Sequence, residues 1–138
     1  ENMVSDGKIK LSNLKPGPGG GIWAKNTFGE NNAIVIAGSN VQGLQYAIYD
    51  FSKDILGVDP LEYWTGKLPK KKSVEDLLDF SPKTIAAPKV PLLTYFENDV
   101  DELANYRGEL LKYDWESYTE MINPLVRLRY NSIQLFDM

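Results

Sequence analysis

The chain contains no cysteine and no histidine. Without cysteine, disulfide bonds and thiolate chemistry are excluded, and the redox compartment is left open. Histidine is the residue type that most often serves as a general base or metal ligand near neutral pH. Its absence makes carboxylates the main candidates for acid–base chemistry in this protein.

Long apolar runs and an excess of basic residues are also missing. Nothing approaches the ~18 consecutive apolar residues of a membrane-spanning helix. The formal net charge is −4, and the one basic run, Lys70–Lys72, lies in a polar stretch that favours a solvated turn. A nucleic-acid-binding surface needs a basic stripe, so we expect neither a nucleic acid nor a membrane as a partner. The chain begins at Glu1 without a signal peptide, from which we expect a mature or trimmed product.

The sequence has 138 residues, of which 43% are hydrophobic and 25% charged, as in a soluble domain with one core. The aromatic-rich run Ile22–Phe28 and the apolar run Ala33–Ala37 flank a short Gly-Asn turn, which predicts a hairpin. Because Ala33–Ala37 is apolar throughout, it predicts a central strand covered on both faces. Leu61–Trp64 is predicted to be a further strand that returns to the same sheet.

A helix is predicted between these strands. Ser39 and Gln42 have the spacing of a capping box, so the helix should begin at about Asn40. Gly57 suits the left-handed residue that ends a helix. Apolar residues at helical spacing predict one buried face, made of Leu44, Ala47, Ile48, Phe51 and Ile55.

The second half of the chain predicts a βαβ unit. A short helix is expected from Ser73, and the proline-containing segment 81–91 is expected to be a domain linker. Strands are predicted at Pro91–Phe96 and Ser132–Phe136, and the helix between them should begin after Asp114, with Pro124 kinking or dividing it. A strand, helix and strand of these lengths indicate two parallel strands.

Three stretches of the chain resemble one enzyme family. They are Gly7–Leu14, the run from Ile34 to Lys71 with its Tyr63-Trp64 pair, and Pro88–Val90 leading to Glu97-Asn98-Asp99. In this order they are similar to family-115 glycoside hydrolases, which remove (4-O-methyl)glucuronic acid from xylan. The chain departs from the family at Pro91-Leu92-Leu93, at the insert 101–113 and at Phe136-Asp137-Met138.

The resemblance implies an α/β fold in two parts. Residues 1–87 would form a small mixed-sheet accessory domain with its linker, like the second domain of family-20 hexosaminidases and the corresponding domain of family-67 α-glucuronidases. Residues 88–138 would form the opening βαβ unit of a (β/α)₈ barrel. A whole barrel needs roughly 200 residues or more, so the catalytic acid and base are expected beyond Met138 and the chain is expected to be inactive alone.

Four residues are the candidates for contact with substrate. In a barrel, function collects at the carboxyl ends of the strands, which here carry Glu97, Asn98, Asp99 and Asp137. The resemblance implies that they hydrogen-bond sugar hydroxyls in the parent enzyme. Three alternatives stay open: a polar loop that only solvates the strand end, an acid–base pair of Glu97 with Asp137, and a divalent cation on Glu97, Asp99 and Asp101.

The resemblance also implies hydrolysis with inversion, by carboxylates and water, without a cofactor or metal. The implied partners are a polysaccharide or oligosaccharide substrate and the remainder of the barrel, and the implied location is secreted or periplasmic. The alternative is a non-catalytic carbohydrate-binding or interaction module. A nucleotide-binding protein is disfavoured, because Gly38–Gly43 lacks the Gly-Lys-Ser/Thr ending of a phosphate-binding loop. An incomplete barrel would expose apolar residues, so the chain is expected to self-associate or to remain partly mobile after Pro88. The residues expected to be exposed are Leu125, Val126, Leu128 and Phe136.

Overall fold

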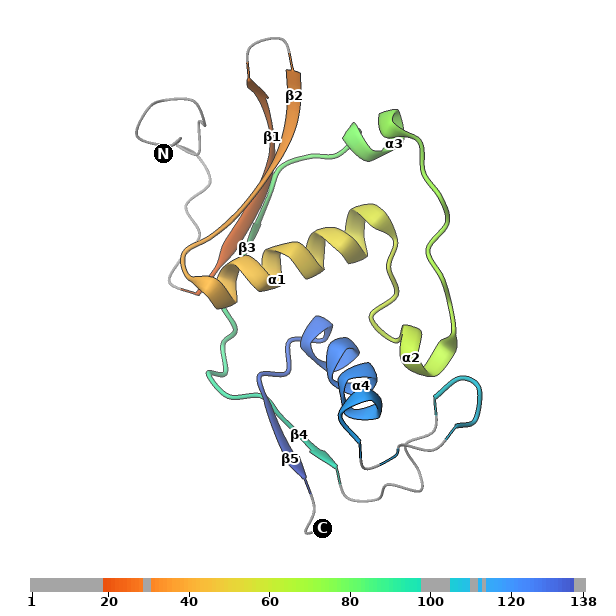
Figure 1. The fold of residues 1–138 in the computed structure, drawn as a ribbon. Coiled ribbons are helices and arrows are strands. Elements are labelled where there is room, and N and C mark those ends of the chain that lie inside the picture. Colours follow the sequence, from red (N-terminus) through yellow and green to blue (C-terminus); the bar gives the residue numbers. More distant parts are fainter. Residues whose placement is uncertain (1–18, 29–30, 98–104, 110–111, 113, 136–138) are drawn as a thin grey trace. The chain divides into compact units, whose positions relative to one another are not determined.

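The computed structural model of the chain describes residues 19–28, 31–97, 105–109, 112 and 114–135 (Figure 1). The protein is a small mixed α/β protein. Its described residues form a three-stranded antiparallel sheet, a two-stranded parallel sheet and four α-helices. By its internal contacts the chain divides into two compact units: the first is Glu1–Leu56 with Lys71–Lys89, and the second is Gly57–Lys70 with Val90–Met138.

The sheet of the first unit has the strand order β2-β1-β3 and is antiparallel throughout. Its strands are β1 (Gly21–Phe28), β2 (Asn31–Gly38) and β3 (Lys83–Ile85). The predicted hairpin is confirmed, since Trp23 of β1 pairs with Ile36 of β2. The prediction that Ala33–Ala37 is a central strand is wrong, because β1 occupies the centre of the described sheet. An apolar run is compatible with several depths of burial, and here most of the β2 side chains are only half-buried.

The segment predicted to be a linker contributes the third strand. Lys83 of β3 pairs with Trp23, so residues 83–85 complete the sheet instead of bridging two domains. The short helix α3 (Val74–Leu78) precedes it and begins with the predicted capping box, in which Ser73 and Asp76 bond each other's backbone N–H.

Helix α1 (Val41–Phe51) packs closely on the sheet and continues into a π-helical turn, η1 (Ser52–Leu56). Its cap is Asn40, whose Oδ1 accepts from the N–H of Gly43 at 2.7 Å. Ser39, the predicted cap, instead donates its hydroxyl to the carbonyl of Gly20 at 3.2 Å. A Cβ on Gly43 would lie 2.2 Å from the same carbonyl oxygen, so only glycine permits this approach.

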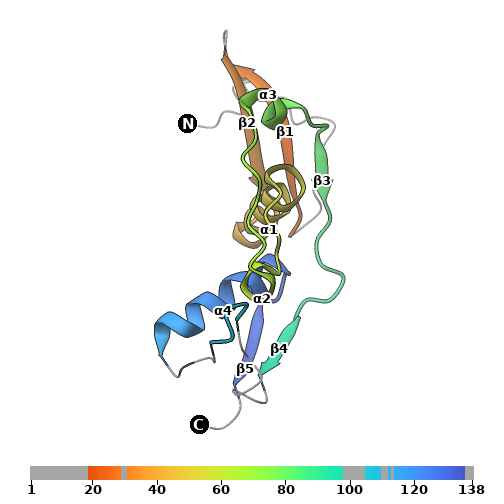
Figure 2. The same cartoon turned by 90° about the vertical axis from the view of Figure 1, so that its right-hand side faces the viewer.

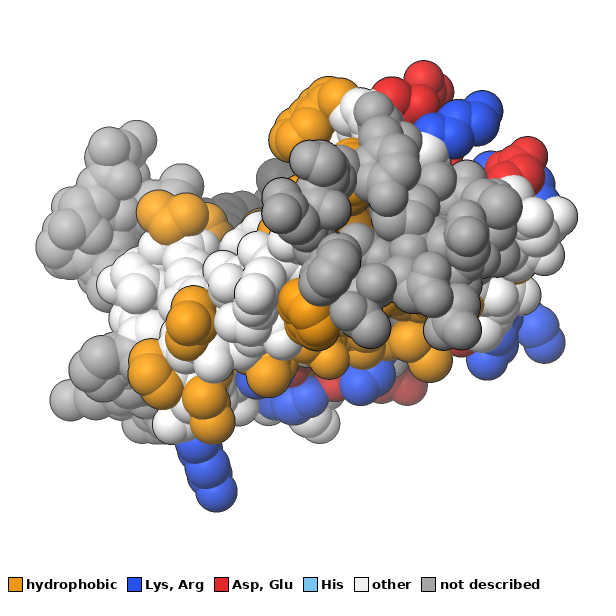
Figure 3. Space-filling view, turned by 90° about the horizontal axis from the view of Figure 1, so that it is seen from below, with side chains coloured by type: hydrophobic (Ala, Val, Ile, Leu, Met, Phe, Trp, Pro, Cys, Tyr) orange, Lys and Arg blue, Asp and Glu red, His pale blue; other side chains and the backbone are white. Residues whose placement is uncertain are grey.

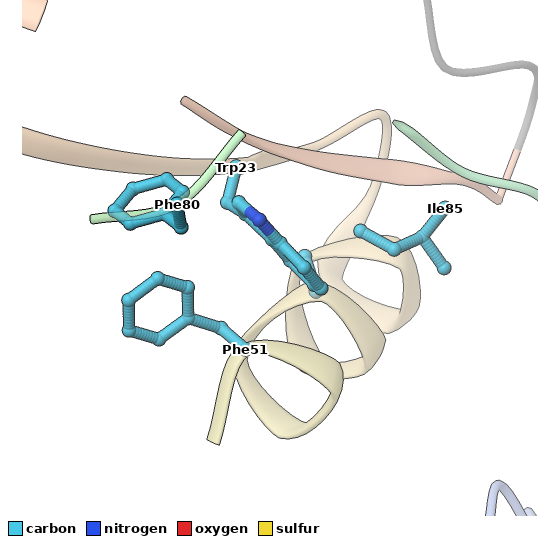
Figure 4. Packing of buried hydrophobic residues seen from close by; sticks show 5 residues of the cluster. Trp23, Phe51, Phe80 and Ile85 are labelled. Carbon is cyan, nitrogen blue, oxygen red and sulfur yellow. The ribbon is translucent and has the colours of Figure 1, made fainter. Parts of the chain in front are cut away.

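The core of the first unit is aromatic and lies between α1 and the sheet (Figure 4). Phe51 meets Trp23 edge to face, with ring centroids 5.7 Å apart, and meets Phe80 in the same way at 5.5 Å. The predicted helix face is correct at Ala47 and Phe51 and wrong at Leu44 and Ile48, which are 37% and 43% exposed. The sheet covers a narrower strip of α1 than the apolar residues occupy.

The second unit is a parallel βαβ arrangement, as predicted. Strands β4 (Thr94–Glu97) and β5 (Ser132–Leu135) pair in parallel from Thr94–Ser132 to Glu97–Leu135. Helix α4 (Trp115–Arg127) connects them and lies beside the strand pair (Figure 2). It runs as one helix through Pro124, so the predicted division into two segments is wrong.

The core of the second unit packs α4 against the strands and against α2 (Glu62–Thr65). The predicted strand Leu61–Trp64 is therefore wrong: this segment forms the short helix α2, which ends at Gly66 in the left-handed conformation. Asp59 favours a helical start, because its carboxylate accepts from the N–H of Leu61 at 2.9 Å.

Helix α4 buries its apolar face more fully than expected for an incomplete barrel. Leu125 is only 4% exposed, so the prediction that it lies open to solvent is wrong. Val126 and Leu128 are half-buried, and Phe136 lies outside the described residues.

We expect Phe51→Ala to lower the free energy of unfolding by about 3–5 kcal/mol, because it removes the ring that joins Trp23 to Phe80. Urea denaturation followed by tryptophan fluorescence measures this change. Val41→Ala in the same helix is the control: Val41 is 85% exposed, so its truncation should change stability by about 0.5 kcal/mol or less. Equal effects of the two substitutions would contradict the core described here.

Candidate functional site

Most of the four residues predicted to contact substrate lie outside the residues that the structure describes. Glu97 is the last residue of β4 and its backbone pairs with Leu135 at the end of β5. The side chain of Glu97 lies outside the described parts of the chain, as do Asn98, Asp99 and Asp137. The sugar-binding role of these residues and the alternatives for them, including a cation site with Asp101, therefore stay predictions.

The described part of the second unit contains a polar cleft of about 510 Å³. It lies where residues 105–109 and Lys112, in the connection from β4 to α4, meet the first turns of α4 and the helix α2. Its lining residues are Tyr63, Asn105, Arg107, Glu109, Lys112, Asp114, Glu116, Ser117 and Glu120. A recess of about 270 Å³ shares Tyr63, Asn105, Arg107 and Glu120 with the cleft and is otherwise lined by Glu62, Tyr106, Asn123, Pro124 and Arg127.

Asn105 organises the wall of this cleft and is the one buried polar residue of the described chain, at 8% exposure. Its Oδ1 accepts from the backbone N–H groups of Arg107 and Glu109, at 2.9 and 3.1 Å. Its Nδ2 donates to Oε2 of Glu109 at 2.7 Å. The backbone closes the same turn, because the N–H of Asn105 donates to the carbonyl of Glu109 at 3.0 Å.

Arg107 and Glu109 form an ion pair on this turn. Nε and Nη2 of Arg107 both lie 2.7 Å from Oε2 of Glu109, and Nη2 lies 3.8 Å from Oε2 of Glu120. The hydrogen bonds from Arg107, and then from Asn105, hold the pKa of the Glu109 carboxyl below its usual value. The same bond to Glu109 raises the pKa of Arg107.

Helix α2 is fastened to the turn by Tyr106. The backbone N–H of Tyr106 donates to the carbonyl of Tyr63 at 2.9 Å. Its ring lies against Gly66, where a Cβ would come within 2.5 Å of Cδ2. Glu62 and Arg127, 3.1 Å apart, form a second link, between α2 and α4. These contacts join two walls of the cleft, the turn and α2, to each other and link α2 to α4.

The N-terminus of α4 supplies the remaining wall. Oδ1 of Asp114 caps the helix by accepting from the N–H of Ser117 at 2.8 Å, and this bond lowers the pKa of the Asp114 carboxyl. Tyr63 of α2 also lines the cleft and packs against the apolar cluster on α4. Burial raises the pKa of its phenol, and the nearby charge of Glu120 raises it further, so the hydroxyl keeps its proton at neutral pH.

The cleft offers hydrogen-bond donors and acceptors rather than a metal site. No group of three or more metal-binding side chains occurs among the residues that the structure describes. The sequence did not single out this segment, which was noted only as an insert. A signal was nevertheless present: Asn105 followed by Gly108 is typical of a turn closed by an asparagine side chain.

Comparisons with known proteins find no matching family model, no matching curated protein and no matching solved structure. Within the described ranges, no helix has the length and apolar character needed to cross a membrane.

We expect the pKa of Glu109 to lie below its ordinary value, and Arg107→Gln to raise it, because the substitution removes the charged hydrogen-bond donor. Carboxyl-detected NMR titration measures both values. Lys53→Gln, in the first unit, is the matched control and should leave the pKa of Glu109 unchanged.

The same shift predicts how stability depends on pH. Because the pKa of Glu109 is lowered by folding, its contribution to stability is complete above its unfolded pKa and is lost as the pH falls through its folded pKa. The stability difference between the wild-type chain and Arg107→Gln should therefore shrink on acidification. A difference that grows as the pH falls would contradict the ion pair.

Proposed function

We propose that the chain is part of a glycoside hydrolase that acts on plant polysaccharide and removes (4-O-methyl)glucuronic acid side chains from xylan. One observation supports this proposal most directly: β4, α4 and β5 have the parallel strand–helix–strand arrangement from which a (β/α)₈ barrel is built. The carboxyl ends of the two strands lie side by side, at Glu97 and Leu135. Glu97 is followed directly by Asn98 and Asp99, and Asp137 comes two residues after Leu135.

The exposure of the strand pair also fits an incomplete barrel. Parallel sheets are normally covered on both faces. Tyr95 and Ile133 pack against the cluster on α4, whereas Phe96, which alternates with Tyr95 along β4, is 48% exposed. Other exposed hydrophobic residues lie on or near these strands: Val90, Leu92, Leu93 and Leu135. Figure 3 shows hydrophobic side chains at the surface of one face of the molecule. Further strands of a barrel would cover such a surface.

In this proposal residues 1–87 form the hexosaminidase-like accessory domain and residues 88–138 open the catalytic barrel. The described antiparallel sheet with its helix α1 is compatible with a small accessory domain. Glu97, Asn98, Asp99 and Asp137 would hydrogen-bond the sugar, and catalytic carboxylates on later strands would hydrolyse the bond with inversion and without a cofactor. The substrate implies a secreted or periplasmic enzyme.

A second candidate function is a non-catalytic carbohydrate-binding or interaction module. The observation that favours it is the cleft, whose frame of hydrogen bonds is complete within the described residues of the second unit. A module of this kind would bind its ligand without any further strands.

The first test is the intact mass of the native polypeptide. We expect a protein at least ~150 residues longer than this chain, because a whole barrel needs roughly 200 residues or more and residues 88–138 would supply only about 50 of them. The native protein should release uronic acid from glucuronoxylan. A native product of only 138 residues, or a longer one that releases no uronic acid, would overturn the hydrolase proposal.

The predicted site residues are tested in the same native protein. Asp99→Asn and Asp137→Asn should each lower kcat/KM about 10- to 100-fold, the range expected when a charged hydrogen bond to substrate is lost. Asp79→Asn is the matched control, because Asp79 is exposed in the first unit, and it should keep full activity. Unchanged kcat/KM in both test variants would remove these residues from the substrate site.

A further inference from the structure

We propose that the outer edge of β2 is an interface between two copies of this chain, in which the two β2 strands pair antiparallel about a two-fold axis at Val35. The two sheets of the first units then become one continuous sheet. This inference goes beyond the proposed hydrolase function. It uses only residues of the first unit, so it stands or falls independently of the catalytic assignment.

The edge of β2 is long and uncharged. β2 is the last strand on one side of the described sheet, and all eight of its residues pair with β1 on its inner side. Its sequence, NNAIVIAG, contains no charged residue and no proline, which are the residues that keep edge strands from pairing with another chain. The opposite edge of the described sheet is protected, because β3 has only three residues and begins with Lys83. The edge that is open to a further strand is therefore that of β2.

Half of the backbone groups of β2 point away from β1. The N–H of Ser39 donates to the carbonyl of Gly20 at 2.9 Å, which continues the ladder and makes these two residues a hydrogen-bonded pair. Bonded and non-bonded pairs alternate along an antiparallel ladder, so every second residue of β2 directs its N–H and C=O outward. The outward residues are Asn32, Ile34, Ile36 and Gly38. Within the described ranges, no hydrogen bond reaches these outward groups from another segment.

The outward groups of β2 match those of a second copy. When Val35 lies opposite its counterpart in an antiparallel pair, Asn32 lies opposite Gly38 and Ile34 lies opposite Ile36. All four outward residues then form hydrogen-bonded pairs, with two bonds per pair and about eight in all. A register shifted by two residues leaves one outward residue of each copy unpaired. Because the pairing uses the same edge in both copies, the assembly closes as a dimer.

The side chains that meet near the two-fold axis are apolar on both faces of the sheet. Ile34 meets Ile36 on the face that carries α1, because Ile36 packs against the core beneath that helix. Val35 meets its counterpart on the other face, with Ala33 and Ala37 beside it. Branched apolar pairs across strands stabilise a sheet, whereas like charges directly opposite destabilise it. A charged residue near the axis would meet the same charge in the second copy, so the uncharged sequence of β2 favours a second copy as the partner.

The first test is analytical ultracentrifugation of the full chain at neutral pH. Two paired strands bury a small area, so we expect a dimer with a dissociation constant on the order of 10–100 μM. Ile34→Lys places a charge on the edge and should raise this constant at least about tenfold. Leu44→Lys on α1 and Leu92→Lys in the second unit are the matched controls, because both residues are exposed, and they should leave the constant unchanged. Circular dichroism of each variant verifies that the fold is retained.

A cross-linking experiment locates the two-fold axis. The chain has no cysteine, so a single substitution introduces its only thiol. In the proposed register the two Cα atoms of residue 35 lie about 4.5 Å apart, within the range of a disulfide. Val35→Cys should therefore form a disulfide-linked dimer in the presence of oxidised glutathione. Ala33→Cys is the control on the same face, because its two copies lie about 13 Å apart along the strands and should not cross-link.

Hydrogen exchange of the backbone amides tests the alternation along β2. The outward amides of Ile34 and Ile36 should exchange more slowly as the protein concentration rises, because they are bonded only in the dimer. The amide of Val35 points to β1 and should not respond to concentration in the same way. NMR spectra recorded below and above the dissociation constant measure this difference.

Several outcomes would overturn the inference. A chain that stays monomeric at all concentrations, or that forms larger assemblies instead of dimers, would exclude the closed β2 pair. Association that Leu92→Lys or Leu44→Lys abolishes and Ile34→Lys leaves intact would place the interface on the second unit or on α1. Equal cross-linking of Val35→Cys and Ala33→Cys would exclude the two-fold register. None of these results bears on uronic acid release by the native protein, so the two proposals fail separately.

Discussion

The side-chain amide of Asn105 is buried, and a buried amide needs partners for both its oxygen and its nitrogen. The chain meets this need by wrapping residues 105–109 around the side chain, which gives the amide three hydrogen bonds. The wrapping in turn presents Arg107 and Glu109 to each other and Tyr106 to the helix α2. The cleft therefore depends on the satisfaction of one polar side chain more than on any apolar contact.

The first unit depends on apolar packing instead. Trp23 is 1% exposed, and its ring packs with Phe51 and Ile85 (Figure 4). The ammonium of Lys83 lies 4.9 Å from the centroid of the Trp23 ring. Lys83 also pairs with Asp54 at 2.5 Å, so its charge is compensated at the edge of the core. Trp23 Nε1 is buried without a hydrogen-bond partner among the described residues. The unit tolerates this loss because the aromatic core buries a large apolar area.

The strand ends and the polar cleft occupy different positions along the chain in the second unit. The strand ends at Glu97 and Leu135 precede the residues proposed to meet the substrate of a hydrolase. The connection that follows β4 contributes to the polar cleft. In a barrel both belong to the loops that follow the strands, where such folds place their binding sites.

The amino-acid sequence by itself determined the features that depend on near neighbours. The hairpin of β1 and β2, the capping box at Ser73, the cap at Asp114 and the parallel βαβ unit follow from turn residues, capping spacing and apolar periodicity, and they are predictable for that reason. The carboxyl ends of β4 and β5 were predictable in the same way, because a strand, helix and strand of these lengths indicate that the two strands are parallel.

Only the tertiary structure decided what depends on distant partners. Leu61–Trp64 has the composition of a strand but forms α2, because Asp59 and Gly66 favour a short helix that packs on α4. The sequence around Lys83–Ile85 is typical of a linker, but this segment forms β3 because it pairs with the edge of β1. The cleft joins Tyr63 to Glu120, 57 positions later in the chain, and no local pattern records that approach. Pairing and burial between distant segments are set by the whole fold, so these features are absent from any short stretch of the sequence.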